Sequence, residues 1–335
     1  MQTKQTILFC LPNLNGGGAE RVLINIMKYN YSPNEYNVKL LLVDNIGVYF
    51  DFIPEYVEVI SLDIKRVRNA FNPLVNKINE INPDIVFSTT NRMNLLILIA
   101  SFFLKNKPKI IVREPNLPSA QIKNKTLKWW HIFLIKLLYK RADKVIAQTS
   151  EMKEEICEYF AIKCDKVEVL INPIDKDAIN NLVNHQKNPF DSKYINLVAI
   201  GRLTYQKGYD ILIKSFKKVV AQNSKYRLFI LGDGPDRIVL EKLIVDLDLT
   251  NYINLLGFKD NPYLYIKYAD ALVLSSRWEG LPNVVLEAIY LDTFFIATRT
   301  VEFLEELTKN NENGYLVNIE DIDDLSQKIL QVKNK

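Results

Sequence analysis

Cysteine and histidine are scarce in this chain, which has three cysteines and two histidines among its 335 residues. Cys10, Cys157 and Cys164 follow no zinc-binding spacing and are too few for a disulfide framework, so no disulfide is expected. A reducing compartment, the cytoplasm, is the plain inference. His131 and His185 leave little material for a histidine metal site or a catalytic triad.

Long apolar runs and a strong overall charge are also missing. No stretch approaches the roughly 18 apolar residues of a membrane-spanning helix, and the run 7–11 is too short for the core of a signal peptide. The net charge is +4, which does not favour nucleic acid as a partner. The charge is uneven, however, because the segment 105–144 holds eleven Lys and Arg but only two acids.

Short apolar runs alternate with helical patterns along almost the whole chain. Strands are expected at 6–11, 37–43, 57–60, 84–88, 109–113, 144–148, 167–171, 194–200, 226–231, 253–256, 271–275, 294–297 and 315–317. Helices are expected at 18–29, 70–80, 93–104, 125–141, 151–160, 208–222, 235–247, 262–268, 283–291 and 321–333. This α/β alternation indicates parallel sheets, and one open sheet rarely holds so many strands.

The alternation is interrupted at Asn172-Pro173, where a polar stretch begins. We predict a first domain at 1–172, a linker at 173–193, a second domain at 194–320 and a C-terminal helix at 321–335. Ligands of such sheets bind beyond the carboxyl ends of the strands. A site is therefore expected in a cleft between two facing domains.

A glycine-rich loop, Asn15-Gly-Gly-Gly-Ala-Glu20, follows the first expected strand and opens a helix. Glycines let a ligand approach the backbone, and the helix start behind them can hold an anion. The spacing is not the G-x-G-x-x-G of dinucleotide sites. A flexible turn between strand and helix is the alternative.

Two cations, Arg202 and Lys207, lie five positions apart after the expected strand 194–200, between Gly201 and Gly208. Two fixed cations can stabilise the negative charge that develops on a departing diphosphate. Arg can contact two oxygens, whereas Lys acts as a point charge. A solvated basic loop is the alternative, but the position after a parallel strand favours a site.

Two glutamates, Glu279 and Glu287, flank the sequence Gly-Leu-Pro-Asn-Val-Val-Leu. The first follows the expected strand 271–275, and the second lies on a helix that starts near Pro282. The start of a helix favours an anion, and nearby carboxylates suit ligand hydroxyls, a combination that fits a nucleotide sugar. Ordinary helix capping is the alternative.

Two shorter motifs lie between these segments. Gly232-Asp-Gly-Pro235 reads as a tight turn into a helix, and Asp233 fits a structural turn as well as the rim of a ligand site. Gly257-Phe258 follows another expected strand, where the backbone could meet a flat base.

In this order the motifs resemble the family-4 retaining glycosyltransferases. The resemblance covers nearly the whole chain and is densest from 196 to 290, ending in Trp278-Glu-Gly-Leu-Pro-Asn…Glu287-Ala. It implies a GT-B fold, with two facing Rossmann-like α/β domains and the nucleotide sugar mainly on the second. It also implies a reaction without metal or cofactor, and the chain offers no convincing D-x-D motif.

The resemblance assigns roles to individual residues. Arg202 and Lys207 would bind the diphosphate, Glu279 would contact the transferred sugar, and Glu287 would hold the ribose hydroxyls. The backbone groups that would assist Glu279 belong to Gly280, Leu281, Pro282 and Asn283.

Three further residues would contact the donor through the backbone. Phe258 would meet the base, and Gly17 and Gly18 would approach the phosphates or sugar from the first domain. The chain departs from many relatives at 87–91, where Phe-Ser-Thr-Thr-Asn replaces a histidine that contacts the sugar. It departs again at 297–303, where a glycine-rich turn is missing.

The basic segment contains an expected amphipathic helix within 123–144. Apolar residues recur there at i, i+4 and i+8, and the cations beside them are Lys128, Lys136, Lys140 and Arg141; the apolar residues are Trp129, Trp130, Phe133, Leu134, Leu137 and Leu138. Trp and Lys together suit a helix that lies on an anionic membrane surface and presents a lipid-linked acceptor. The alternative is a helix that packs its apolar face on the sheet.

We therefore expect a retaining glycosyltransferase of the cytoplasm, peripheral at the inner face of the cell membrane. It would move a hexose or N-acetylhexosamine from a UDP-sugar to a growing lipid-linked glycan of a bacterial polysaccharide, lipopolysaccharide, capsule or glycoprotein. Two alternatives stay open: a GT-B nucleotide-sugar epimerase and a non-catalytic scaffold that binds sugar nucleotides.

Overall fold

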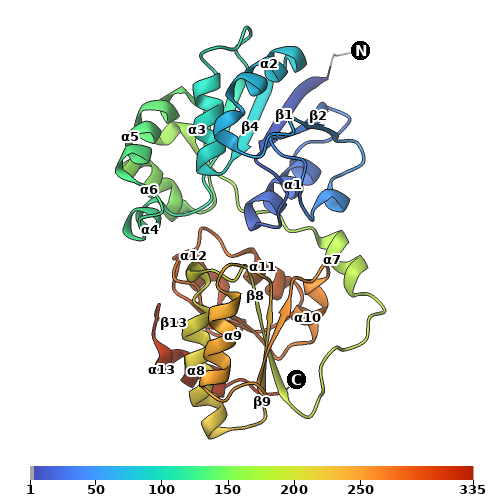
Figure 1. Ribbon diagram of the computed structural model, residues 1–335, viewed down its shortest axis with the longest axis vertical. Helices are drawn as coiled ribbons and strands as arrows, with labels where there is room; N and C mark the ends of the chain where they lie inside the picture. Colours follow the sequence, from blue (N-terminus) through green and yellow to red (C-terminus); the bar gives the residue numbers. More distant parts are fainter. Residues whose placement is uncertain (1–3, 335) are drawn as a thin grey trace. The chain divides into compact units, whose positions relative to one another are not determined.

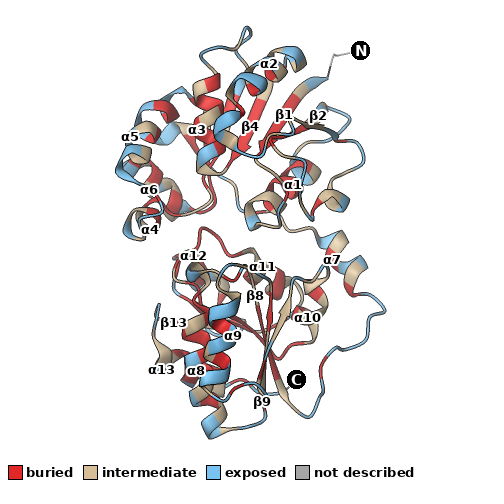
Figure 2. Cartoon of the chain, viewed as in Figure 1, coloured by how far each residue is buried: buried red, intermediate tan, exposed pale blue. Residues whose placement is uncertain are grey.

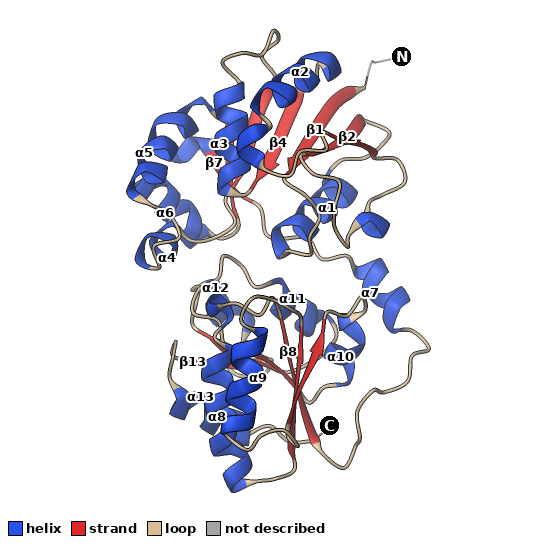
Figure 3. Ribbon diagram, in the orientation of Figure 1, coloured by secondary structure: helices blue, strands red, loops and turns tan. Residues whose placement is uncertain are grey.

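Each half of the chain forms one parallel β-sheet with helices packed against it (Figures 1 and 3). The computed structural model describes residues 4–334. The chain divides into two units, of which the first ends at Pro173 and the second begins at Ile174.

The first unit has seven strands in the order β3-β2-β1-β4-β5-β6-β7, and all neighbouring pairs are parallel. The strands are β1 (Gln5–Leu11), β2 (Tyr36–Leu42), β3 (Glu58–Ser61), β4 (Ile85–Thr89), β5 (Lys109–Arg113), β6 (Lys144–Ala147) and β7 (Val167–Val169). The order reverses between β1 and β4, which places the switch point of this sheet there.

The second unit has six parallel strands in the order β10-β9-β8-β11-β12-β13. They are β8 (Ile195–Ile200), β9 (Tyr226–Leu231), β10 (Ile253–Gly257), β11 (Ala271–Leu274), β12 (Phe295–Thr298) and β13 (Gly314–Val317). The order reverses between β8 and β11. All of these strands lie at positions predicted from the short apolar runs.

The helices of the first unit are α1 (Gly18–Asn30), α2 (Phe71–Ile81), α3 (Asn91–Ala100), α4 (Pro118–Lys123), α5 (Trp129–Leu138) and α6 (Ser150–Phe160). Those of the second are α7 (Lys176–Val183), α8 (Tyr209–Gln222), α9 (Arg237–Asp246), α10 (Pro262–Tyr268), α11 (Asn283–Tyr290), α12 (Phe303–Leu307) and α13 (Ile322–Leu330). Five short 3₁₀ turns are η1 (Phe50–Phe52), η2 (Val67–Asn69), η3 (Tyr139–Arg141), η4 (Cys164–Lys166) and η5 (Tyr205–Lys207).

Several helices begin where a side chain caps the first backbone N–H groups. Thr149 accepts a bond from the Met152 amide to start α6, and Asp175 accepts one from the Ala178 amide to start α7. The expected helix at 125–141 is shorter than predicted. The chain leaves the helical conformation at Lys125, where φ is +54°, and α5 starts only at Trp129.

The segment 173–193, predicted to be a linker, contains the helix α7 and is tied to the second unit. The Asn180 amide donates to the Tyr290 hydroxyl at 2.8 Å, and the Asn261 amide donates to the Leu182 carbonyl at 2.7 Å. The predicted C-terminal helix corresponds to α13, which packs against α8 as part of the same unit. The helix α7 was not predicted because its surface is mostly polar, with only Ile179 and Val183 buried.

Each unit has its own hydrophobic core, visible as buried strands in Figure 2. Phe9 and Leu40 are fully buried in the first core, and Leu228 and Ile230 in the second. The rigid strands hold the loops at their carboxyl ends, where the candidate site lies. No helix in the described part of the chain is long and apolar enough to cross a membrane.

Cys157 and Cys164 form a disulfide, so the expectation that none would form is wrong. The helix α6 ends at Phe160, and Ala161 adopts a left-handed conformation that turns the chain back. The two Cα atoms consequently lie 5.5 Å apart, although a spacing of seven residues matches no familiar framework. Cys10 is a buried free thiol.

Candidate active site

The loops after β8 and β11 meet because these two strands are neighbours at the switch point of the second sheet. The side-chain amide of Gln206 donates to the Trp278 backbone carbonyl at 2.9 Å, and the backbone N–H of Arg277 donates to the Gln206 backbone carbonyl at 2.7 Å. The Ser275 hydroxyl donates to the Lys207 carbonyl at 2.9 Å. Two loops about 70 residues apart in the sequence are thus joined by hydrogen bonds, one between backbone groups and two from a side chain to a backbone carbonyl.

Gly208 permits this close approach. Its φ is +62°, and a Cβ atom there would lie 2.1 Å from the Ser275 carbonyl oxygen. Only glycine satisfies both conditions. Gly208, one of the two glycines that bracket the cations, is therefore required by backbone packing.

Lys207 and Glu279, two of the predicted site residues, contact each other. The Lys207 ammonium lies 2.6 Å from Glu279 Oε1, and the Ser276 hydroxyl donates to the same oxygen at 2.6 Å. Glu279 is 7% exposed. Burial, and then the charge of Glu279, raise the pKa of the neighbouring Tyr209 hydroxyl. A diphosphate that binds Lys207 would share the ammonium with Glu279 or displace that carboxylate.

Arg202 and Phe258 are open to solvent. The Arg202 side chain is exposed, and among the described residues it has no hydrogen-bond or ion-pair partner. Phe258 is 45% exposed and follows Gly257, which ends β10 with φ of +72°. The free guanidinium after β8 and the exposed Phe258 after β10 are both accessible to a ligand.

The helix α11 starts at Asn283, directly after the loop that carries Glu279. Pro282 at its N-cap has no side chain that can cap the helix, and no acid lies in its first turn. Gly280, Leu281 and Pro282 are buried. Glu287 is 3% exposed and lies on α11 as predicted. This helix start suits an anionic ligand better than a capped one would.

In the glycine loop of the first unit, Gly16 rather than Gly17 or Gly18 has the backbone conformation that favours glycine. Gly17 is the N-cap of α1 with an ordinary φ of −82°, and Gly18 begins the helix. Gly16 has the positive φ, +88°. A Cβ on Gly17 would lie 2.1 Å from a carboxylate oxygen of Glu20, so the space beside Gly17 is taken by that side chain.

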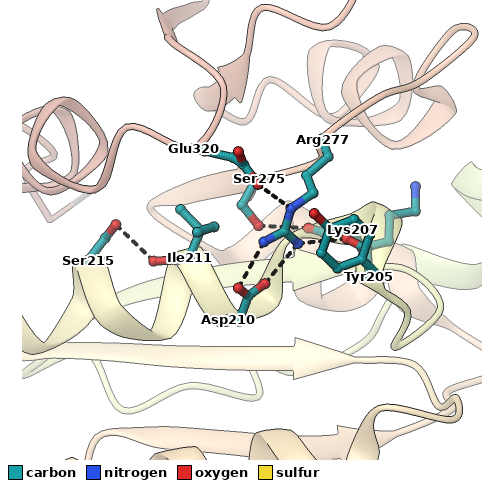
Figure 4. Close-up of polar contacts among 8 residues, drawn as sticks. All are labelled: Tyr205, Lys207, Asp210, Ile211, Ser215, Ser275, Arg277 and Glu320. Atoms are coloured by element: carbon teal, nitrogen blue, oxygen red, sulfur yellow. Dashed lines mark hydrogen bonds and ion pairs between the residues drawn. The ribbon is translucent and has the colours of Figure 1, made fainter. Parts of the chain in front are cut away.

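Arg277 was not singled out from the sequence, yet it lies at the centre of the joined loops (Figure 4). Its guanidinium bonds to Asp210 on α8, to Glu320 after β13 and to the Tyr205 carbonyl. The signal available was a basic residue between the end of a strand and Glu279. It was not used because its partners are distant in the sequence.

A second polar cluster lies at the carboxyl ends of β4, β5 and β6, and it is sealed from solvent. The buried carboxylate of Glu114 accepts a short hydrogen bond from the Tyr139 hydroxyl, which itself accepts one from the Asn94 amide at 3.0 Å. Burial raises the pKa of Glu114 to about 7, against the opposing effect of hydrogen bonds from Tyr139 and Gln121. Burial also lowers the pKa of Arg113 to about 10.

The surface of α5 is strongly apolar. Trp129 is 80% exposed, Phe133 62% and Leu137 57%, whereas Ile135 and Leu138 pack inward. The alternative that α5 packs its apolar face inward therefore fails for Trp129, Phe133 and Leu137 and holds for Leu138. The exposed Phe102 lies beside it, with the Arg141 guanidinium 3.8 Å from its ring centre.

Two α/β units with polar residues at the carboxyl ends of their parallel sheets are compatible with many ligand-binding proteins and define no particular activity. Family models resolve the class. The model described as Glycosyltransferase Family 4 matches residues 16–178, and Glycosyl transferases group 1 matches residues 181–335.

Individual relatives agree with the family models. An amylovoran biosynthesis glycosyltransferase of Erwinia amylovora, AmsD, is 30% identical over 82% of this chain and 75% of its own length. An N-acetylgalactosaminyltransferase of Campylobacter jejuni, whose named acceptor is a diphospho-undecaprenol glycan, is 28% identical over 94% of this chain and 86% of its own. An uncharacterized glycosyltransferase of Methanocaldococcus jannaschii is 35% identical over 66% of this chain, which spans only 57% of that relative.

Among solved structures, Anabaena HepE in complex with UDP and glucose matches with a TM-score of 0.78 at 21% identity, covering 97% of this chain and 89% of that one. The chain belongs to the family-4 glycosyltransferases and has the GT-B fold, as predicted. It is an enzyme of the glycosyltransferase class.

Proposed function

We propose that this enzyme transfers a hexose or N-acetylhexosamine from a UDP-sugar to a lipid-linked glycan, with retention of the anomeric configuration. The observation that carries the proposal is the ion pair between Lys207 and Glu279. Arg202, in the same loop as Lys207, is exposed to solvent. Cations for a diphosphate and a carboxylate for sugar hydroxyls thus meet at one switch point.

The chemistry asked of these residues is electrostatic. Arg202 and Lys207 stabilise the negative charge that grows on the departing UDP, and the uncapped start of α11 adds its N–H groups. Glu279 orients the transferred sugar, and Glu287 holds the ribose. The departing phosphate accepts the acceptor proton on the face from which it leaves, which gives retention without a protein nucleophile.

Support for a lipid-linked acceptor comes from outside the site. The Campylobacter relative is named for transfer to a diphospho-undecaprenol glycan, and the Erwinia relative is named for amylovoran biosynthesis. We propose that this chain serves the assembly of a bacterial polysaccharide or glycoprotein glycan in the same way. Neither metal nor cofactor takes part in the proposed reaction.

We further propose that the α5 surface holds the enzyme at the inner face of the cell membrane. The exposed side chains of Trp129, Phe133 and Leu137 are flanked by exposed cations, namely Lys128, Lys136, Lys140 and Arg141. Apolar residues that enter the interface and cations that attract anionic lipid are the two requirements of such a helix.

The experiment is incubation of the enzyme with a panel of UDP-sugars and isolated lipid-linked acceptors, with product mass and anomeric configuration as readouts. We expect one acceptor to gain one sugar with the donor's configuration. A soluble sugar isomer formed without acceptor would indicate an epimerase, and UDP binding without any product would indicate a scaffold. Either result would refute the proposal.

A further inference from the structure

Arg277 ties together three segments of the second unit that carry or adjoin the proposed donor site. Its Nη1 and Nη2 groups donate to the two carboxylate oxygens of Asp210 at 2.9 and 2.8 Å, and its Nε donates to Glu320 at 2.5 Å. Asp210 lies in the first turn of α8, and Glu320 follows β13. A planar guanidinium can make all these bonds at once, and an ammonium cannot.

The same side chain also holds the backbone just before Lys207. Nη1 donates to the Tyr205 carbonyl at 2.7 Å, and the guanidinium carbon lies 3.9 Å from the centre of the Tyr205 ring (Figure 4). The main-chain N–H of Arg277 donates to the Gln206 carbonyl at 2.7 Å. Arg277 therefore holds both residues that precede Lys207, and it lies two positions before Glu279.

The Arg277 side chain is the most buried member of this cluster. The Arg277 side chain is 7% exposed, whereas the Asp210 side chain is 34% exposed and the Glu320 side chain 51% exposed. Burial works against the charge of Asp210, but hydrogen bonds from Arg277 outweigh it and lower the pKa of that carboxyl. The guanidinium thus offsets one of the two negative charges of Asp210 and Glu320, which would otherwise repel an anion bound by the neighbouring loop more strongly.

We infer that Arg277 is a positioning residue for the donor diphosphate, which sets the separation of Lys207 and Glu279 and offsets part of the negative charge of Asp210 and Glu320. The inference rests on the proposed function, since it concerns the same donor site. It adds a residue that makes none of the proposed substrate contacts itself and acts through the loop 205–208.

The test uses Arg277→Gln in the full-length enzyme, with Lys218→Gln as the matched control. Lys218 pairs with Asp323 on the surface of the same unit, so the control also removes one cation and one ion pair involving α8. We expect Arg277→Gln to raise the KM for the UDP-sugar and the Kd for UDP, and to lower kcat, each by about tenfold or more. The KM for the acceptor should stay unchanged, and the control should match the wild type.

Two further variants separate positioning from charge. Arg277→Lys keeps the cation but loses the multiple bonds, so we expect it to recover UDP affinity more than kcat. The triple variant Arg277→Gln, Asp210→Asn, Glu320→Gln removes the repelling carboxylates, so we expect it to recover UDP affinity without restoring kcat. If Arg277→Gln does not fold, Arg277→Lys carries the test alone, with kcat reduced against the control.

A readout that needs no substrate is hydrogen exchange of the segment 203–208 in the ligand-free protein. We expect faster exchange there in Arg277→Gln, with no change in β10. A folded Arg277→Gln variant with wild-type exchange, donor KM and kcat would overturn the inference while leaving the proposed function intact. If the wild type neither binds UDP nor transfers sugar, the proposed function fails. Unchanged hydrogen exchange of 203–208 in Arg277→Gln would refute the positioning role of Arg277 independently of that result.

Discussion

Charged groups lie at the carboxyl ends of both sheets, but they reach solvent in the second unit and are buried in the first. In the second unit Arg202 is exposed, and the Lys207 side chain is 21% exposed and pairs across two loops. In the first unit Arg113 is 2% exposed and Glu114 is fully buried. Charges that reach solvent can exchange partners with a ligand, whereas sealed charges can only support the fold.

The outer surfaces of the two units differ as well. The first unit carries the apolar and basic face of α5, with Trp129 at 80% exposure. The proposed membrane contact therefore belongs to the first unit, and the proposed donor chemistry belongs to the second. The predictions below test this division, beginning with the largest effect.

Replacing Lys128, Lys136, Lys140 and Arg141 by Gln should weaken binding to anionic vesicles by about 1000-fold at low salt, since each cation near the surface contributes about 1 kcal/mol. The loss should shrink as salt is added. Sedimentation with vesicles measures it, and the fluorescence of Trp129 and Trp130 should shift to the blue on binding. The control replaces four exposed lysines of the second unit, Lys214, Lys218, Lys225 and Lys242.

Hydrolysis of the sugar nucleotide should survive in the variant that replaces the four α5 cations, because the proposed donor residues lie in the other unit. Equal sedimentation of the wild type and both variants would show that α5 is a solvated face and remove the basis for assigning membrane contact to the first unit.

Lys207→Ala and Arg202→Ala should each lower kcat by roughly two orders of magnitude or more, the usual loss on removing one preorganised donor to a transition-state charge. Steady-state kinetics with the UDP-sugar measures this, and Lys218→Gln is the control. If both variants fold and turn over near the wild-type rate, the diphosphate does not bind between these cations.

Glu114 should make the stability of the wild type depend on pH. Its pKa is raised from 4.5 to about 7 in the folded protein, so folding favours the protonated carboxyl. The contribution is fully present below pH 4.5 and is lost as pH rises through about 7, a loss of up to about 3 kcal/mol from this group. Arg113 and Tyr139, which face this carboxyl, keep their protons throughout that range.

Glu114→Gln should abolish this part of the pH dependence. Urea unfolding of the wild type and the variant at pH 5 and pH 8 measures it, and Glu154→Gln, on the exposed surface of α6, is the control. Parallel stability curves for the wild type and Glu114→Gln would mean that the carboxyl is already ionised in the folded state.

The smallest effect is expected from a chelator. Activity should be unchanged in EDTA, because the proposed stabilisation of the diphosphate comes from Arg202, Lys207 and the start of α11. If EDTA abolishes activity and Mn²⁺ or Mg²⁺ restores it, a metal ion rather than Arg202 and Lys207 supplies the main positive charge at the diphosphate.

Strands were predictable because each is a short apolar run, and burial on both faces of a parallel sheet demands such a run. The helix α7 was missed because only Ile179 and Val183 carry its apolar pattern, although Asp175 supplies a capping signal. The disulfide was missed because it depends on the turn at Ala161 rather than on a framework of spacings.

The candidate site was predictable only residue by residue. Glycines and charges after a strand mark a ligand loop, so Arg202, Lys207, Glu279 and Glu287 could be singled out. The sequence could not show that Lys207 pairs with Glu279, because that contact depends on β8 and β11 being neighbours.

The sequence by itself determined the α/β alternation and the family, and it singled out the proposed donor residues, since these depend on local periodicity and short motifs. The tertiary structure decided the order of the strands, the sealing of Glu114, the exposure of α5 and the place of Arg277. Each of these depends on contacts between distant segments, such as the 67 positions that separate Asp210 from Arg277. A local pattern specifies which face of an element is apolar, but only the packed fold specifies what that face meets.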